Sequence, residues 1–149
     1  MRIAGVLPFS MVNGDGIRYV VFCQGCDHHC EGCHNPDTWN LNGGSFVTPE
    51  SLAEDILQHK HIDGITLSGG DPFYQQEECV DLLKLLPGMN VWIYTGFLYE
   101  EIQHTQLAQM ADYIVDGRFE QDKKVTEKMY GSSNQRIINV KTNGLYLEV

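Results

Sequence analysis

The amino-acid sequence predicts an α/β fold built on a mostly parallel sheet. Short runs rich in β-branched and aromatic residues recur along the chain, and most of them end in Gly or Cys. Segments with helical spacing of apolar residues lie between these runs. Because the 149 residues contain no internal repeat and no linker-like tract, we expect a single domain over residues 1–149.

Five runs are the strand candidates. Each is short, as expected for a strand buried in a sheet, and the helical segments between them suggest βαβ units with parallel strands. In chain order they cover residues 17–22, 64–67, 91–94, 113–115 and 137–140.

Three segments carry helical signals. The first begins at Thr48, a good N-cap that is followed by Pro and an acidic residue. The second covers residues 75–86 and stops before a Pro-Gly pair, and the third, weaker one covers residues 99–110.

Composition and charge exclude several classes of protein. Lys and Arg number 10 against 20 Asp and Glu, so the net charge is −10, and nucleic-acid binding is disfavoured because it needs clustered cations. The N-terminus lacks the pattern of a signal peptide, and no window approaches the roughly 18 apolar residues of a membrane-spanning helix. We therefore expect a soluble, cytoplasmic protein.

Unusual residues follow four of the predicted strands. The first strand leads into a cysteine-rich segment, the second into Ser-Gly-Gly-Asp at 68–71, the third into Thr95, and the fourth into Asp-Gly-Arg at 116–118. Ligands of parallel sheets bind beyond the carboxyl ends of the strands. The sequence therefore predicts that these residues converge on one edge of the sheet.

Four of the five cysteines lie within eleven residues, at Cys23, Cys26, Cys30 and Cys33. The last three have the spacing C-x3-C-x2-C, and a loop this short can wrap several sulfurs around a compact iron–sulfur cluster. The spacing favours such a cluster and leaves open whether Cys23 is a ligand.

Zinc is the main alternative for this segment, because His28, His29 and His34 offer nitrogen ligands. Structural zinc sites usually separate their two C-x2-C pairs by more residues than this chain does. Disulfides or unliganded thiols are a third possibility.

Other features have structural explanations. Taken alone, residues 68–71 indicate a tight turn between strand and helix, and residues 13–16 a polar connector. His59 and His61 suit the end of a helix because its dipole favours them there. Cys79 lies on the apolar face of its predicted helix, which indicates a buried, inert thiol.

Taken together, the motifs resemble the radical S-adenosylmethionine superfamily, and within it the small activating proteins of anaerobic ribonucleoside-triphosphate reductases. The superfamily resemblance rests on the three-cysteine motif and its flanks, residues 25–35. The closer resemblance rests on segments spread in one order along the chain: 12–14, Trp39, 41–42, 67–72, 92–96, 115–117, Phe119 and 131–135. The sequence departs from the family pattern at Asp15, His34 and Arg118, where Pro, Tyr and Lys are common.

The resemblance implies an incomplete (βα) barrel of the radical S-adenosylmethionine type, with its active site at the carboxyl ends of the strands. It implies that Cys26, Cys30 and Cys33 are the catalytic residues and the ligands of a [4Fe-4S] cluster. Three cysteines ligate three irons, which leaves the fourth for the amino and carboxylate groups of S-adenosylmethionine.

The resemblance also implies three groups of S-adenosylmethionine contacts, at the methionine amino end, beside the adenine, and near the ribose and carboxylate. In that order they are Gly69, Gly70 and Asp71; Gly32 and His34; and Thr95, Asp116 and Arg118, and Cys33 is a further cofactor-binding residue.

The implied activity is that of an oxidoreductase that cleaves S-adenosylmethionine reductively and removes a hydrogen atom from a glycine of a partner protein. The implied partner is the glycyl-radical subunit of an anaerobic ribonucleoside-triphosphate reductase, with flavodoxin or ferredoxin as electron donor. Two alternatives stay open: an activase of another glycyl-radical enzyme, such as a formate-lyase type, and a non-enzymatic zinc or iron–sulfur module.

Overall fold

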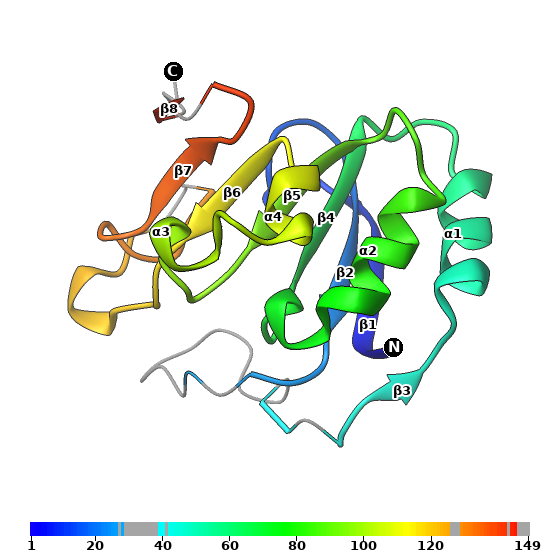
Figure 1. Ribbon diagram of the computed structural model, residues 1–149, viewed down its shortest axis with the longest axis horizontal. Helices are drawn as coiled ribbons and strands as arrows, with labels where there is room; N and C mark the ends of the chain where they lie inside the picture. Colours follow the sequence, from blue (N-terminus) through cyan, green and yellow to red (C-terminus); the bar gives the residue numbers. More distant parts are fainter. Residues whose placement is uncertain (27, 29–38, 41, 126–128, 143, 146–149) are drawn as a thin grey trace.

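The computed structural model describes residues 1–149 except 27, 29–38, 41, 126–128, 143 and 146–149. Its strands form one sheet in the order β3-β1-β2-β4-β5-β6-β7-β8 (Figure 1). The strands are β1 (Arg2–Ser10), β2 (Arg18–Cys23), β3 (Ser45–Phe46), β4 (Gly64–Gly69), β5 (Asn90–Tyr94), β6 (Tyr113–Asp116), β7 (Arg136–Asn139) and β8 (Gly144–Leu145). The helices are α1 (Pro49–Gln58), η2 (Pro72–Gln75), α2 (Gln76–Lys84), α3 (Tyr99–Ile102), α4 (Gln106–Met110) and η3 (Gln121–Lys123).

The centre of the sheet is parallel, as predicted. Strands β2, β4, β5 and β6 pair in that order, with Cys23 beside Gly69 and Leu67 beside Ile93. Their carboxyl ends therefore share one edge of the sheet, the lower edge in Figure 1. All four strands were expected from the sequence.

Antiparallel strands extend the sheet on both sides. Strand β1 runs antiparallel to β2 and β3, and β7 runs antiparallel to β6 and β8. The sequence predicted β7 but missed β1, which contains Gly5 and Pro8. Pro8 is tolerated because it lies where the β1–β2 pairing is irregular and beyond the short β3. The parallel arrangement thus holds for the centre of the sheet only.

The first two predicted helices are present and the third is divided. Helix α1 begins as expected, with the Thr48 hydroxyl accepting a hydrogen bond from the Ser51 N–H at 3.1 Å. The second predicted helix starts with the η2 turn and continues as α2. The prediction of one helix over residues 99–110 is wrong, because Thr105 caps α4 as a separate helix by accepting from the Ala108 N–H.

The helices cover one face of the sheet, and the main hydrophobic core lies between the two layers (Figure 1). A smaller cluster of Trp92, Val115 and Ile137 lies on the opposite face. Because β3 and β8 stand at the two ends of the strand order, the described strands form an open sheet.

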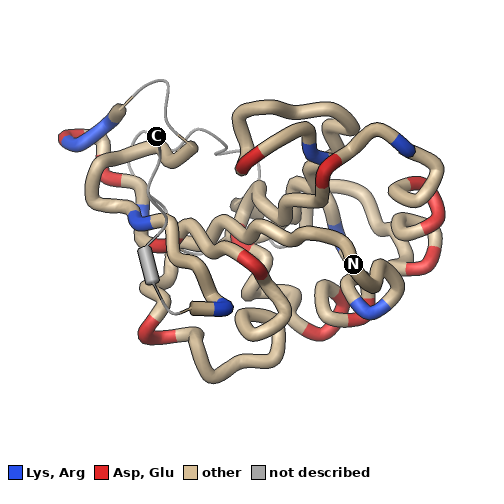
Figure 2. Tube along the Cα trace, turned by 90° about the horizontal axis from the view of Figure 1, so that it is seen from above, with Lys and Arg blue, Asp and Glu red and all other residues tan. Residues whose placement is uncertain are grey.

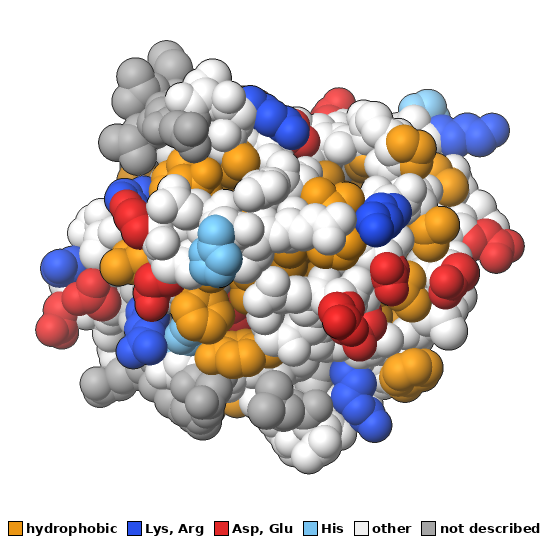
Figure 3. Space-filling view, in the orientation of Figure 1, with side chains coloured by type: hydrophobic (Ala, Val, Ile, Leu, Met, Phe, Trp, Pro, Cys, Tyr) orange, Lys and Arg blue, Asp and Glu red, His pale blue; other side chains and the backbone are white. Residues whose placement is uncertain are grey.

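The helical layer is acidic. Figure 2 shows Asp and Glu recurring along the chain trace. Helices α1, α2 and α3 carry Glu50, Glu54, Asp55, Glu77, Glu78, Asp81, Glu100 and Glu101. Hydrophobic side chains also reach this surface among the charged ones (Figure 3). In the described part of the chain, no helix has the length and hydropathy needed to cross a membrane.

Candidate functional site

Backbone hydrogen bonds join the carboxyl ends of β2 and β4. Beyond the last strand pair, the Gly70 N–H donates to the Cys23 carbonyl and the Asp71 N–H donates to the Gly25 carbonyl, both at 2.8 Å. The turn after β4 therefore lies directly against the segment that leads from β2 to Cys26. This contact confirms the predicted convergence of these two strand ends.

Asp71 connects this edge to the end of β5. Its buried carboxylate accepts hydrogen bonds from the Phe73 N–H at 3.1 Å, the Thr95 hydroxyl at 2.9 and 3.0 Å, and the Gly96 N–H at 2.9 Å. The His28 Nε2 lies 2.7 Å from the same carboxylate. A carboxylate offers about four lone-pair sites, so these protein groups occupy the acceptor capacity of Asp71. Thr95, implied near the ribose, directs its hydroxyl to Asp71.

His28 is enclosed by aromatic side chains. Its side chain is 3% exposed, and its ring centroid lies 4.7 Å from that of Phe97 and 5.8 Å from that of Tyr74. Its Nδ1 is buried without a hydrogen-bond partner among the described residues. The sequence indicated His28 only as a possible zinc ligand, because no local pattern reveals a contact between residues 43 positions apart.

Cys26 is the one implied cluster ligand that the structure describes. It is buried, and its N–H donates to the Trp39 carbonyl at 3.2 Å. The other implied site residues of this segment lie outside the described residues: Cys30, Gly32, Cys33 and His34. Among the residues that are described, no three His, Cys, Asp or Glu side chains gather as a metal site.

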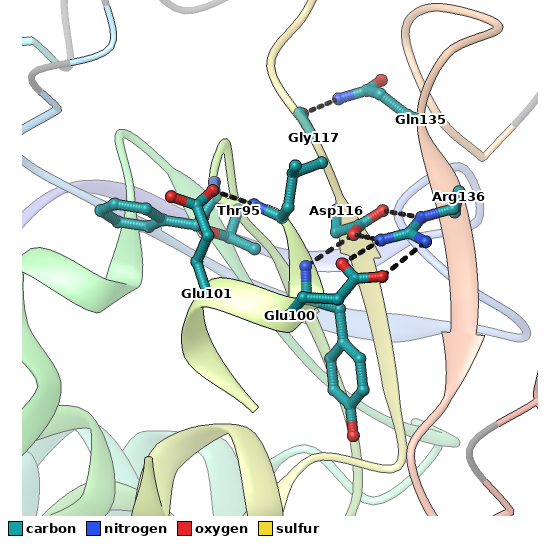
Figure 4. Close-up of polar contacts among 10 residues, drawn as sticks. Thr95, Glu100, Glu101, Asp116, Gly117, Gln135 and Arg136 are labelled. Carbon is teal, nitrogen blue, oxygen red and sulfur yellow. Dashed lines mark hydrogen bonds and ion pairs between the residues drawn. The ribbon is translucent and has the colours of Figure 1, made fainter. Parts of the chain in front are cut away.

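Asp116, Arg136 and Glu100 form an ion-pair network at the end of β6 (Figure 4). Arg136 on β7 donates to both oxygens of Asp116 and to both oxygens of Glu100. The Tyr99 N–H also donates to Asp116 at 2.7 Å, so this carboxylate caps the start of α3. The sequence singled out Asp116 but neither of its charged neighbours.

These hydrogen bonds shift the pKa values of the network. The hydrogen bond from Arg136 lowers the pKa of Glu100 to about 2. The hydrogen bonds to Glu100 and Asp116 raise the pKa of Arg136. Glu100 and Arg136 are therefore both charged at neutral pH, and their hydrogen bonds tie α3 to β6 and β7.

Arg118, also implied near the ribose and carboxylate, has an exposed side chain. Its backbone carbonyl accepts from the Asn134 side chain at 2.9 Å, and the neighbouring Gly117 carbonyl accepts from Gln135 Nε2 at 2.8 Å (Figure 4). Two of the segments that carry the resemblance, 115–117 and 131–135, thus hold each other in place.

Cys23 lies in the core. Both Cys23 and Cys79 are fully buried there, and a hydrogen bond with Cys23 and burial raise the pKa of Cys79 well above its usual value. The predicted burial of Cys79 is confirmed. The side chain of Cys23 is directed toward Cys79, between the sheet and the helices.

The described residues fit a thiolate-bound cluster and its organic ligand at this edge. Cys26 offers a thiolate, the usual ligand of iron–sulfur clusters, and two more thiols follow within seven residues of sequence. In the same region the buried Nδ1 of His28 has no hydrogen-bond partner among the described residues. A buried nitrogen without a partner lowers the stability of the fold, and a bound ligand that supplies the hydrogen bond removes this loss.

Similarity to known proteins supports an iron–sulfur cluster in this chain. A protein-family profile described as a 4Fe-4S single cluster domain matches residues 12–138. The chain is 37% identical over 145 residues to the anaerobic ribonucleoside-triphosphate reductase-activating protein of Enterobacteria phage T4, covering 92% of this chain and 93% of that protein. It is 36% identical over 143 residues to the protein of the same name from Escherichia coli K12, covering 86% and 92%.

A second kind of relative is longer. The chain is 43% identical over 118 residues to the pyruvate formate-lyase-activating enzyme of Clostridium pasteurianum, covering 71% of this chain and 50% of that enzyme. The match to the first kind of relative therefore extends over nearly the whole of both proteins, and the match to the second does not.

Proposed function

Because the chain belongs to the family of anaerobic ribonucleoside-triphosphate reductase-activating proteins, we propose that it is a radical S-adenosylmethionine enzyme that generates a glycyl radical on such a reductase. The observation that carries this proposal is the match over nearly the full length of both the phage and the bacterial protein. The partner is then the glycyl-radical subunit of the reductase.

In this proposal Cys26, Cys30 and Cys33 bind three irons of a [4Fe-4S] cluster, and the fourth iron is left for S-adenosylmethionine. When bound, the cluster and S-adenosylmethionine supply the one-electron chemistry that removes a hydrogen atom from glycine, which no amino-acid side chain of this site can do by itself. A small electron carrier of the cytoplasm, such as flavodoxin or ferredoxin, reduces the protein.

The turn after β4 binds the amino end of S-adenosylmethionine. Gly69 and Gly70 carry no side chains, so their backbone can approach a ligand closely. Asp71 and Thr95 hold this turn and the turn after β5 in place, because they are hydrogen-bonded to each other at 2.9 and 3.0 Å.

The remaining contacts are assigned by the family resemblance. Gly32 and His34 flank the adenine, and Cys33 is a further contact of the cofactor. Asp116 and Arg118 border the ribose and carboxylate, with Asp116 fixed by its hydrogen bonds to Arg136. The open sheet is then the incomplete (βα) barrel of this superfamily, and its open side admits a peptide segment of the partner.

A second candidate function is the activation of a formate-lyase type enzyme. It is favoured by the 43% identity to the pyruvate formate-lyase-activating enzyme of Clostridium pasteurianum. That match covers only 50% of the longer relative, so we rank this function second.

The test is an anaerobic assay with the reconstituted, reduced protein. We expect about four irons per chain, cleavage of S-adenosylmethionine, and a glycine-centred doublet in the electron paramagnetic resonance spectrum once the reductase of the same organism is added. Cys33→Ser should abolish all three signals, and Cys23→Ser should retain them. A doublet only with a different glycyl-radical enzyme would favour the second candidate, and zinc without iron would favour a non-enzymatic metal module.

A further inference from the structure

One buried contact joins the cysteine segment to the turn after β4. His28 lies two residues after Cys26 and two before Cys30 in the sequence. Its Nε2 is 2.7 Å from Asp71 Oδ2, and the two side chains are 3% and 0% exposed. Because the Asp71 carboxylate already accepts from the Phe73 and Gly96 N–H groups, we assign the donor role in this contact to the Nε2 of His28.

The surroundings fix the position of the His28 ring. Phe97 meets it edge to face with 4.7 Å between ring centroids, and Tyr74 lies beside Phe97 with its ring centroid 5.8 Å from that of His28. Gly96 lies so close that a Cβ there would be 2.5 Å from the His28 ring. The ring therefore has little freedom to turn away from Asp71.

Asp71 is fixed as firmly as His28. Three donors besides His28 hold its carboxylate, from the start of η2 and from the turn after β5. A ligand that bound this carboxylate directly would have to displace one of these donors. The carboxylate is thus placed to hold parts of the protein together.

We propose that His28 is a positioning residue, whose hydrogen bond to Asp71 fixes the backbone next to Cys26 against the turns after β4 and β5. The inference rests on the proposed function and deepens it. It explains how Cys26 is held at a fixed position relative to the turns that bind S-adenosylmethionine. Asp71 acts in the same way, through His28 and the backbone.

Two substitutions of His28 separate the hydrogen bond from the packing. His28→Gln keeps an N–H donor with the reach of Nε2, whereas His28→Phe keeps an aromatic ring and loses the donor. His59→Phe is the matched control, since His59 bonds its own helix at the Asp55 carbonyl and packs on Tyr19 near the start of β2.

The measurements are the dissociation constant of S-adenosylmethionine and the rate of iron loss to a chelator, both with the reconstituted protein. We expect His28→Phe to raise the dissociation constant at least about tenfold and to speed iron loss, the effect of losing a hydrogen bond to a charged group. For His28→Gln and His59→Phe, the dissociation constant and the rate of iron loss should stay within about threefold of the values of the parent protein. A role in packing alone predicts the opposite order for the two His28 variants and would overturn the inference.

A double-mutant cycle with Asp71→Asn tests the pair itself. If His28 acts through Asp71, the double variant His28→Phe/Asp71→Asn binds S-adenosylmethionine no more weakly than Asp71→Asn alone, whose loss also includes the contacts of Asp71 with Phe73, Thr95 and Gly96. Additive losses contradict the inference. Should His28→Phe fail to fold, His28→Asn replaces it, because its shorter amide does not reach Asp71.

A measurement on the protein without its cluster distinguishes this inference from the proposed function. In the metal-free protein, nitrogen NMR of the histidine rings should show His28 protonated at Nε2, with a signal that shifts in Asp71→Asn. An unshifted signal overturns the pair whether or not the enzyme is active. A parent protein that shows this signal but neither holds iron nor cleaves S-adenosylmethionine contradicts the proposed function instead.

Discussion

Gly69 ends β4 in a conformation that other residues rarely adopt, with φ at +94°. A Cβ at this position would lie 2.5 Å from the Cys23 nitrogen and 2.6 Å from its carbonyl oxygen. We therefore expect Gly69→Ala to lower the free energy of unfolding by about 3 kcal/mol, because backbone strain and a clash with a neighbouring strand act together. Urea denaturation measures this loss.

Gly88 is the matched control for Gly69. Its φ is +78°, but a Cβ there would meet nothing within 4 Å. Gly88→Ala should therefore lower the free energy of unfolding by about 1 kcal/mol, because it adds only the strain of the left-handed conformation. Equal losses for the two variants would show that the close approach of Gly69 to Cys23 does not matter.

At the scale of secondary-structure elements, Arg18 joins the starts of three parallel strands. Its buried guanidinium, on β2, donates to Thr66 Oγ1 and the Ile65 carbonyl on β4 and to Asn90 on β5. Burial lowers the pKa of Arg18 to about 10. We expect Arg18→Met to lower the free energy of unfolding by about 3 kcal/mol, because several buried acceptors lose their donor. Chemical denaturation at neutral pH checks this value.

Arg2 provides the comparison for Arg18. Its side chain is half-buried on β1 and donates over a long 3.5 Å to the Gly43 carbonyl. Arg2→Met should lower the free energy of unfolding by less than about 1 kcal/mol. A similar cost for both variants would mean that the hydrogen bonds of Arg18 contribute little to the joining of the strands.

The network of α3, β6 and β7 gives the protein an acid-sensitive contact. Arg136 lowers the pKa of Glu100 from an ordinary 4.5 to about 2. The folded state thus favours the ionised form of Glu100. The contribution of this ion pair to the stability of the fold is present above pH 4.5 and is lost as the pH falls toward 2. Glu100→Gln should lower Tm at pH 6 and weaken the fall of Tm across this window.

The effect of Glu100→Gln should be small and salt-dependent, because the Glu100 carboxylate is exposed. Glu54→Gln on the exposed side of α1 is the control for removing one negative charge. If both variants change the pH profile of Tm alike, net charge rather than the contact with Arg136 explains the result.

At the scale of the whole molecule, the net charge of −10 should affect the rate of association with the proposed reductase partner. Acidic residues recur on the helical layer (Figure 2), so a docking surface on the reductase that matches this charge is basic. We expect the association rate constant with the reductase to fall as sodium chloride rises, because salt screens this attraction. Stopped-flow mixing measures the rate, with sucrose as an uncharged control, and a rate that rises with salt would contradict the expectation.

The sequence by itself determined the local features of this protein. The four parallel strands, the start of α1 and the burial of Cys79 follow from the spacing of apolar residues and from N-cap chemistry, which act over a few neighbouring residues. The cysteine spacing likewise indicated an iron–sulfur cluster, in agreement with the 4Fe-4S domain family that the chain matches.

Only the tertiary structure decided which distant residues meet. His28 reaches Asp71 across 43 positions, and Arg136 reaches Asp116 across 20. Neither contact has a local signature, because each depends on the sheet order that brings separate strand ends to one edge. Tertiary structure also decided strand β1. Its Gly and Pro residues argue locally against a strand, and its pairing with β2 outweighs this local preference.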